Sequence, residues 1–160
     1  MLNGVLWDQG ISNANKKNIY NTVVKSIITY GSEVWQLKSR TENMLLATEM
    51  NYWRRSAGKS KREQITNNRV REIMGVEHTT VDDMRTKQLI WFGHVQRMPD
   101  HRIPKQILLW TPRGRNKRGR PRRSWREGVD KELENGEIPD DLWLNRQEWR
   151  LGVGKRRRTF

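Results

Sequence analysis

The stretch "TTVDDMRTKQLIWFGHVQRMP" (residues 79–99) carries the clearest helical pattern in the chain. Thr80 followed three residues later by Asp83 resembles a capping box, with Asp in place of the usual Glu, and Pro99 ends the run. Between them, one set of side chains recurs at steps of three and four, as one face of an α-helix requires. That set is Met84, Gln88, Trp91, Phe92, Val95 and Met98. The stretch therefore predicts a long helix.

Three segments upstream carry the same kind of signal. Residues 13–31 contain two apolar rows with a spacing of four, which predicts a helix with a wide apolar stripe. Residues 39–58 predict a second helix with Thr41 as its N-cap and a terminal glycine as its stop. Residues 67–75 predict a short helix that starts at one of its two Asn and is closed by Gly75.

Two further helices are predicted downstream. Ser124 and Glu127 form an S-x-x-E capping box at the start of the first. The second is short and carries three residues on one side: Leu142, Arg146 and Trp149. Two short apolar pieces, residues 32–37 and 105–110, are interpreted as strands or extended segments.

The fold class that follows is mostly α, with several short helices in two small clusters joined by an irregular, Arg-rich linker. Residues 1–100 form a helical region and residues 101–123 an extended segment with the basic linker. Residues 124–151 form a short helical pair, and residues 152–160 a basic, disordered tail.

The composition predicts a small and segmented core. Only 34% of the residues are hydrophobic, and the aromatic ones are eight Trp, three Tyr and two Phe. Because Trp fills much volume per residue, a few of them can anchor small helix contacts. The absence of cysteine excludes disulfides and thiolate zinc sites. No apolar run approaches the length of a membrane span, so we expect an intracellular, soluble protein.

Positive charge is concentrated in one part of the sequence. The net charge is +14, and residues 101–126 contain ten Lys or Arg and no acid. Their centre is "RGRNKRGRPRRSWRE" (residues 113–127), and the tail "KRRR" (residues 155–158) adds four more. Such local basicity favours a polyanionic partner, with nucleic acid first and an anionic membrane surface second.

We expect the basic run to make the contacts with nucleic acid, through Arg113, Arg115, Lys117, Arg118, Arg120, Arg122 and Arg123. Contact with phosphates without base preference is the first of two binding modes. The second is insertion into the minor groove of A·T-rich DNA, because residues 118–121 contain the R-G-R-P core of an AT-hook. Lys117 stands where that motif usually has Pro. A nuclear import signal and RNA-specific use remain further alternatives.

Two Trp flank the basic run and could stack on unpaired bases. Trp125 is the first apolar position of a predicted helix, so packing is its favoured role. For Trp110, stacking and packing stay equally open.

Candidate catalytic groups have simpler explanations. Asp82-Asp83 and Asp140-Asp141 could hold metals, but acids at helix starts are favoured by the helix dipole. We expect His94 to be partly buried with one hydrogen bond, because the sequence offers too few ligands for a metal site. Neither a G-x-S-x-G nor a P-loop motif is present. The sequence predicts no enzyme, no cofactor, no metal and no small-molecule substrate.

Four phrases, in order, resemble the C-terminal region of reverse transcriptases from non-LTR retrotransposons. They are "YGSEVWQL" (residues 30–37), "EMNYWRRSAG" (49–58), "RTKQLIWFGHVQRMPDHRIPKQILLW" (85–110) and "KRGRPRRSWRE" (117–127). The likeness covers nearly the whole chain, and "WFGHVQRM" followed by "GRPRRSW" is its most specific part.

The resemblance implies that the chain corresponds to the region after the palm. Within it, residues 1–100 would be the thumb or the connection that follows it. The palm's Y-x-D-D-type aspartates and an endonuclease domain have no counterpart here, so no catalytic residue is assigned. We therefore expect a non-catalytic, nuclear fragment of a truncated element copy that binds RNA or DNA. The alternatives are a helical module that binds a protein through Trp53, Trp91 and Trp149, and a product without function.

Overall fold

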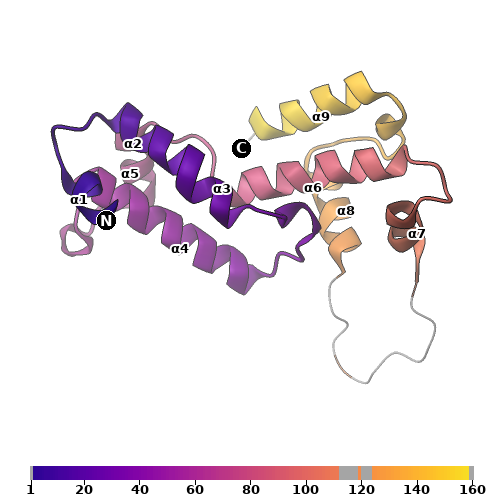
Figure 1. Ribbon diagram of the computed structural model, residues 1–160, viewed down its shortest axis with the longest axis horizontal. Coiled ribbons are helices and arrows are strands. Elements are labelled where there is room, and N and C mark those ends of the chain that lie inside the picture. The colour runs from indigo at the N-terminus through magenta and orange to yellow at the C-terminus, as the bar shows by residue number, and fades with distance from the viewer. Residues whose placement is uncertain (1, 112–118, 120–123, 159–160) are drawn as a thin grey trace. The chain divides into compact units, whose positions relative to one another are not determined.

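The computed structural model describes residues 2–111, 119 and 124–158 (Figure 1). Every regular element in these residues is a helix, which confirms the mostly-α fold class. The chain divides into two compact units. Unit 1 comprises Met1–Gly31 and Lys38–Asp83, and unit 2 comprises Ser32–Leu37 and Met84–Phe160. None of the helices in the described ranges is long and apolar enough to cross a membrane.

Unit 1 consists of helices that pack around aromatic side chains. Its elements are α1 (Leu2–Trp7), α2 (Asn13–Ile19), a π-helical turn (Tyr20–Val24), α3 (Lys25–Ile28), α4 (Ser39–Ser56), a 3-10 turn (Lys61–Glu63) and α5 (Asn67–Met74). From α2 to α3 the helical path is continuous, as the apolar rows predict. The sequence patterns gave no prediction for α1.

Three aromatic rings form the centre of the core of unit 1. The ring centroid of Tyr20 lies 4.7 Å from that of Tyr52 and 4.4 Å from that of Trp53. Burial, reinforced by the nearby charge of Glu49, raises the pKa of the Tyr20 phenol well above its usual range. The neutral hydroxyl is held by the Thr80 hydroxyl, with 2.7 Å between the two oxygens. Tyr20 therefore fills the core while its one polar atom stays paired.

The first turn of α6 (Thr80–Gln96) is fixed by a buried acid on α4. Glu49 accepts a hydrogen bond from the backbone N–H of Thr80, at 3.0 Å, and another from the Trp53 indole, at 3.3 Å. The capping box itself lies one residue before its predicted place. Thr79 and Asp82 form it, because the Thr80 side chain is engaged with Tyr20.

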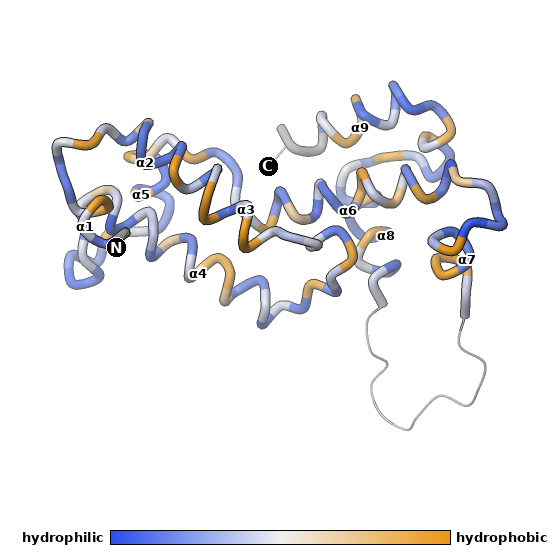
Figure 2. The backbone as a smooth tube through the Cα atoms, in the orientation of Figure 1, coloured by the Kyte–Doolittle hydropathy of each residue, from blue (hydrophilic) through white to orange (hydrophobic). Residues whose placement is uncertain are grey.

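Unit 2 contains the rest of the helices. They are a 3-10 turn (Ser32–Val34), α6 from residue 84 onward, α7 (Ile103–Leu109), α8 (Trp125–Asn135), a second 3-10 turn (Leu142–Leu144) and α9 (Arg146–Arg158). Figure 1 shows α9 running alongside α6. The hydropathy colouring shows that α6 and α9 both alternate between apolar and polar positions (Figure 2).

Trp149 brings α9 onto α6. Its ring packs against Phe92, with 6.1 Å between the centroids, and its indole edge faces Gly93. A Cβ at residue 93 would lie 2.6 Å from Cε2 of that indole, so only glycine allows this approach. Val129 and Leu133 of α8 complete the same core. Gly93 in the "WFGHVQRM" phrase therefore has a packing role.

Both segments interpreted as strands or extended pieces are helical in part, and only residues 35–37 and Trp110 lie outside the helical turns. Residues 32–34 form a 3-10 turn, and α7 covers residues 103–109. In α7, Pro104 lies in the first turn, where its missing N–H costs nothing. A run of four apolar residues cannot distinguish a strand from a short helix, and the contacts of Leu108 with the core of unit 2 decide it.

The predicted domain boundaries also differ from the observed units. The helices before and after the basic run, α7 and α8, belong to the same unit, so the run does not join two clusters. The predicted disordered tail is helical as far as Arg158, because α9 continues past Trp149 and buries Val153. Two glycines in α9 weaken the helical signal in the sequence, because glycine is unfavourable inside a helix. At Gly152 the glycine has a packing reason, since a Cβ there would lie only 2.9 Å from Leu142 Cδ2.

Helix ends follow the predictions only in part. Gly75 closes α5 in the left-handed conformation, with φ of 61°, and Ser124 caps α8. The N-cap of α5 is Thr66, whose hydroxyl accepts from Arg69, and α4 begins before Thr41, at Ser39. Side-chain capping signals thus located the helix ends within about three residues.

A pair of glycine substitutions tests the α6–α9 contact. Gly93→Ala should lower the free energy of unfolding by about 1–3 kcal/mol, because the buried indole of Trp149 has little room to move. Gly128→Ala in α8 should raise it by about 0.5–1 kcal/mol, since a Cβ there meets nothing within 4 Å. Urea unfolding followed by circular dichroism measures both, and equal stabilities would contradict the packing described here.

Candidate nucleic-acid interface

The seven basic residues predicted to contact nucleic acid lie outside the described residues: Arg113, Arg115, Lys117, Arg118, Arg120, Arg122 and Arg123. The residues on both sides of them are described and belong to unit 2. The basic run therefore connects two helices of the same unit, α7 and α8.

The upstream side is α7, which is fixed to unit 2 by a buried lysine. The Lys105 ammonium donates to the backbone oxygen of Gln96 at 2.6 Å and to its side-chain oxygen at 2.7 Å. The same ammonium lies 5.3 Å from the centroid of the Trp143 ring, over its face. Leu108 packs against the apolar core from the same helix. These contacts leave the opposite side of α7 in solvent.

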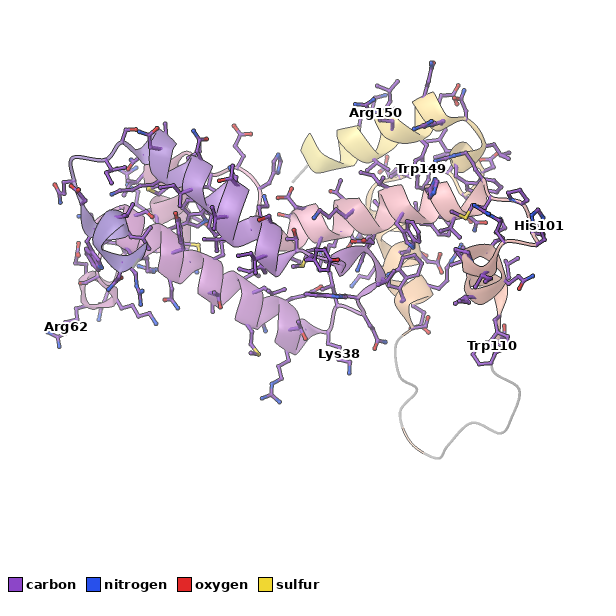
Figure 3. All side chains as sticks on the ribbon, in the orientation of Figure 1. Lys38, Arg62, His101, Trp110, Trp149 and Arg150 are labelled. Carbon is purple, nitrogen blue, oxygen red and sulfur yellow. The ribbon has the colours of Figure 1, made fainter. Side chains whose placement is uncertain are left out.

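The exposed side of α7 is apolar and leads into the basic run. Its side chains are mostly in solvent: Ile103, Ile107, Leu109 and Trp110. Trp110 is 69% exposed, and its backbone has left the helix in an extended conformation. Figure 3 shows its ring projecting beyond the end of α7. The structure thus leaves the ring of Trp110 available for stacking.

The downstream side is the first turn of α8. The Ser124 hydroxyl accepts from the backbone N–H of Glu127 at 3.1 Å, as its position in the capping box predicts. The indole of Trp125 donates to the backbone oxygen of Glu33 at 2.9 Å, and its ring packs on the core of unit 2. Packing is therefore the role of Trp125, as predicted.

Two of the ten basic residues in residues 101–126 are already used within the protein. Lys105 holds α7, and the Arg126 guanidinium lies 4.3 Å from the centroid of the Phe92 ring while its Nε pairs with Asp130 at 2.6 Å. Arg102 is exposed. Among the described basic residues of this stretch, Arg102 is therefore the one without such a role within the protein.

A second group of cations lies on α9. Arg146 and Arg150 are exposed, one turn apart, and Figure 3 shows Arg150 on the side of α9 away from Trp149. Sequence reasoning placed Arg146 with Leu142 and Trp149, but its side chain is in solvent. The sequence did offer a signal for this group of cations, because two Arg that are four residues apart lie on the same face of a helix.

Arg97 lies close to this second group. Its guanidinium donates to the backbone oxygen of Trp143 at 2.7 Å. Burial, and to a lesser extent the positive charge of Arg146, lowers the pKa of Arg97. The two cations are therefore near enough to repel each other, which an anion bound beside them would relieve.

The paired acids are explained mainly by helix starts and ion pairs. Asp82 accepts from the N–H and the hydroxyl of Thr79, and Asp83 pairs with Lys25. Asp140 and Asp141 are exposed, and Asp141 precedes a 3-10 turn without a capping hydrogen bond from its side chain. Capping is thus confirmed for Asp82 but not for Asp141.

Two of the three histidines are more accessible than predicted, whereas His78 is partly buried. His94 is exposed and lies with its ring centroid 5.6 Å from that of Trp91, so the expected partial burial is wrong. His101 is also exposed. Within the described ranges, no three His, Asp or Glu side chains gather as a metal site would require.

The Trp residues predicted to bind a protein partner are largely unavailable. Trp53 is buried in the core of unit 1 and Trp149 in the core of unit 2, because each fills the space between helices of its own unit. Trp91 is partly buried. A protein-binding face built from these three side chains does not exist in the folded units.

Comparison with known proteins bears on the origin of the chain. No protein family model and no solved structure matches the chain. It is 26% identical over 153 residues to an uncharacterized transposon-derived protein of Caenorhabditis elegans. The alignment covers 89% of this chain and 54% of that protein, so the chain spans about half the length of this relative. The similarity indicates a transposon origin.

Proposed function

We propose that this chain is a non-catalytic, nucleic-acid-binding part of a retrotransposon reverse transcriptase. The observation that carries the proposal is the concentration of charge: ten Lys or Arg and no acid in residues 101–126. A polyanion neutralises such a run and releases its own condensed counterions, which drives binding without base recognition. The partner is RNA or DNA, and the setting in which it would meet such a partner is the nucleus.

The reverse-transcriptase part of the proposal rests on the four phrases that resemble that family, and the transposon-derived relative supports it. The structure gives a packing or capping role to some residues of these phrases. Gly93 admits Trp149, and Ser124 starts α8 next to the basic run. The non-catalytic part rests on the absence of a Y-x-D-D-type motif from the sequence.

Phosphate contact is the favoured binding mode. The seven basic residues alternate with glycine, proline and asparagine, residues that are unfavourable within a regular helix. Both flanks of the run are fixed to one unit, so phosphate contacts would form along a tethered segment. Minor-groove insertion by the R-G-R-P core at residues 118–121 is the second mode, and it requires A·T-rich duplex DNA.

A salt series tests the electrostatic term. If about seven cations contact phosphates, log K for duplex DNA should fall with log salt with a slope of roughly −6. Replacement of Arg118, Arg120 and Arg122 by Glu should weaken binding at least about tenfold and flatten the slope by about 3. Fluorescence anisotropy with labelled RNA and DNA measures both quantities.

The control carries the same change of charge in unit 1. Lys38, Arg40 and Arg62 are exposed, and Figure 3 labels the first and the last of them. Their replacement by Glu should leave the affinity within about threefold of that of the parent. Equal losses in the two triple variants would show a net-charge effect and would contradict a role for the basic run.

Substitution of Trp110 tests stacking. Trp110→Ala should weaken binding of single-stranded RNA by about 1–3 kcal/mol, because its exposed ring offers a face to an unpaired base. Binding of duplex DNA should change little, since its bases are already stacked.

Leu109→Ala is the matched control. Leu109 precedes Trp110 and is also exposed, but it has no aromatic face. Its substitution should leave the affinity for both nucleic acids unchanged. The same loss from both substitutions would assign the effect to the apolar surface of α7 and not to stacking.

A further inference from the structure

A small cavity of about 170 Å³ opens in unit 1, far in sequence from the basic run. Its lining comes from the segment after α1, the start of α2, the end of α4 and Ile73 of α5. Six of its lining residues matter to its chemistry: Trp7, Gln9, Asn13, Lys16, Ser56 and Gly58. A water occupies about 30 Å³ of liquid, so there is room for a group several times that size.

Lys16 brings a buried positive charge to this cavity. The residue is only 3% exposed, and its ammonium donates to the backbone oxygen of Ser56 at 2.9 Å. An ammonium has three hydrogens to donate, and this hydrogen bond uses one. A buried charge is costly unless it is paired.

Ser56 adds an unsatisfied hydroxyl. The residue is 2% exposed, and its Oγ has no hydrogen-bond partner. The Tyr52 hydroxyl next to it donates to the backbone oxygen of Lys16 at 2.9 Å. Burial raises the pKa of Tyr52, and a weaker hydrogen-bonding interaction with Ser56 lowers it in part, but the Ser56 Oγ has no partner at full hydrogen-bond geometry. A buried hydroxyl in this position needs a partner from the cavity.

Amide groups at the rim add further donors. One hydrogen of the Asn13 side-chain amide binds the backbone oxygen of Ile73, at 3.3 Å, and the other is left over. Gln9 approaches Gly58 closely, because a Cβ at that glycine would lie 3.4 Å from Gln9 Nε2. The cavity thus gathers N–H and O–H donors from three separate segments of unit 1.

Carboxylates are missing from this lining, although the protein has 18 Asp and Glu. Asp8 is the nearest acid along the chain, and its carboxylate accepts from the backbone N–H of Gly10 at 2.8 Å. A buried ammonium, a free hydroxyl and amide donors without an acid are the complement of an oxyanion.

We infer that this cavity is a binding site for a phosphate group. The phosphate oxygens accept from Lys16 and Ser56 inside the cavity and from Gln9 and Asn13 at its rim. The phosphate is either free in solution or at the end of a nucleic-acid chain, because both present the same oxygens. The inference uses no residue of the basic run and goes beyond the proposed function.

A simpler role for Lys16 is to cap the last turn of α4, since cations are favoured at helix C-termini. Lys17 does this at α5, where its ammonium donates to the backbone oxygen of Gly75 at 2.9 Å. Capping explains the contact of Lys16 with Ser56. Capping does not explain why Lys16 is buried next to an unpaired hydroxyl with no acid nearby. Lys17 caps a helix without these features, so it is the matched control.

Titration of the full chain with inorganic phosphate, at constant ionic strength set by chloride, tests the site by NMR. The signals to follow are the side-chain amides of Gln9 and Asn13, the backbone N–H of Gly58 and the indole of Trp7. They should shift together with one saturable curve. Phosphate that binds only to the basic run leaves these signals in place, so the failure of one proposal is distinguishable from that of the other.

Lys16→Met should weaken the phosphate affinity about tenfold or more, because it keeps the apolar stem and removes the charge. Lys17→Met should leave the affinity unchanged. Ser56→Ala removes only the unpaired hydroxyl and should weaken the affinity severalfold, which keeps the inference testable if Lys16→Met fails to fold. Absence of the NMR shifts, or equal phosphate affinities in all three variants, would contradict a phosphate site in this cavity.

A second titration identifies the source of the phosphate. A short 5′-phosphorylated oligonucleotide is compared with the same oligonucleotide bearing a 5′-hydroxyl. Shifts of the cavity signals by the phosphorylated form alone assign the site to nucleic-acid ends. Shifts by inorganic phosphate but by neither oligonucleotide assign it to the free anion.

Discussion

The close approach of Trp149 to Gly93 is the contact on which unit 2 depends. It brings α9 onto α6, and the core formed there also receives Val129 and Leu133 from α8 and Leu108 from α7. With few apolar residues in the chain, each unit relies on aromatic rings and on polar side chains that find internal partners. Lys105, for example, is buried with two hydrogen bonds. The core of unit 2 thereby fixes the two helices on either side of the basic run.

This arrangement separates structural cations from those available to a partner. Lys105 and Arg126 contact aromatic rings and hydrogen-bond acceptors of unit 2, whereas Arg102, Arg146 and Arg150 are in solvent. Anchoring both ends of a cationic segment limits the conformations it can adopt, which reduces the entropy lost when it binds. In the proposed function, α7 and α8 anchor the basic run, and the basic run binds the nucleic acid.

The sequence predicted the helical class, most helices and the capping role of Ser124, because apolar spacing and capping residues are local signals. It missed the helical state of residues 103–109, since long-range packing decides the structure of a short apolar run. It also missed the cavity at Lys16, because burial of a lysine by distant segments has no local signature. The capping box shifted by one residue for the same reason: Tyr20, far away in sequence, engages the side-chain hydroxyl of Thr80. The seven basic residues of the predicted site stay a prediction.

The central claim is that the segment between α7 and α8 is the part of the protein that meets nucleic acid. Ultraviolet crosslinking of the full chain to single-stranded RNA, followed by mass-spectrometric mapping of the attached peptides, tests it most directly. The account predicts crosslinks concentrated in residues 110–126, with Trp110 the main aromatic site, and their loss at high salt. Crosslinks concentrated in unit 1, or spread evenly over both units, would contradict it.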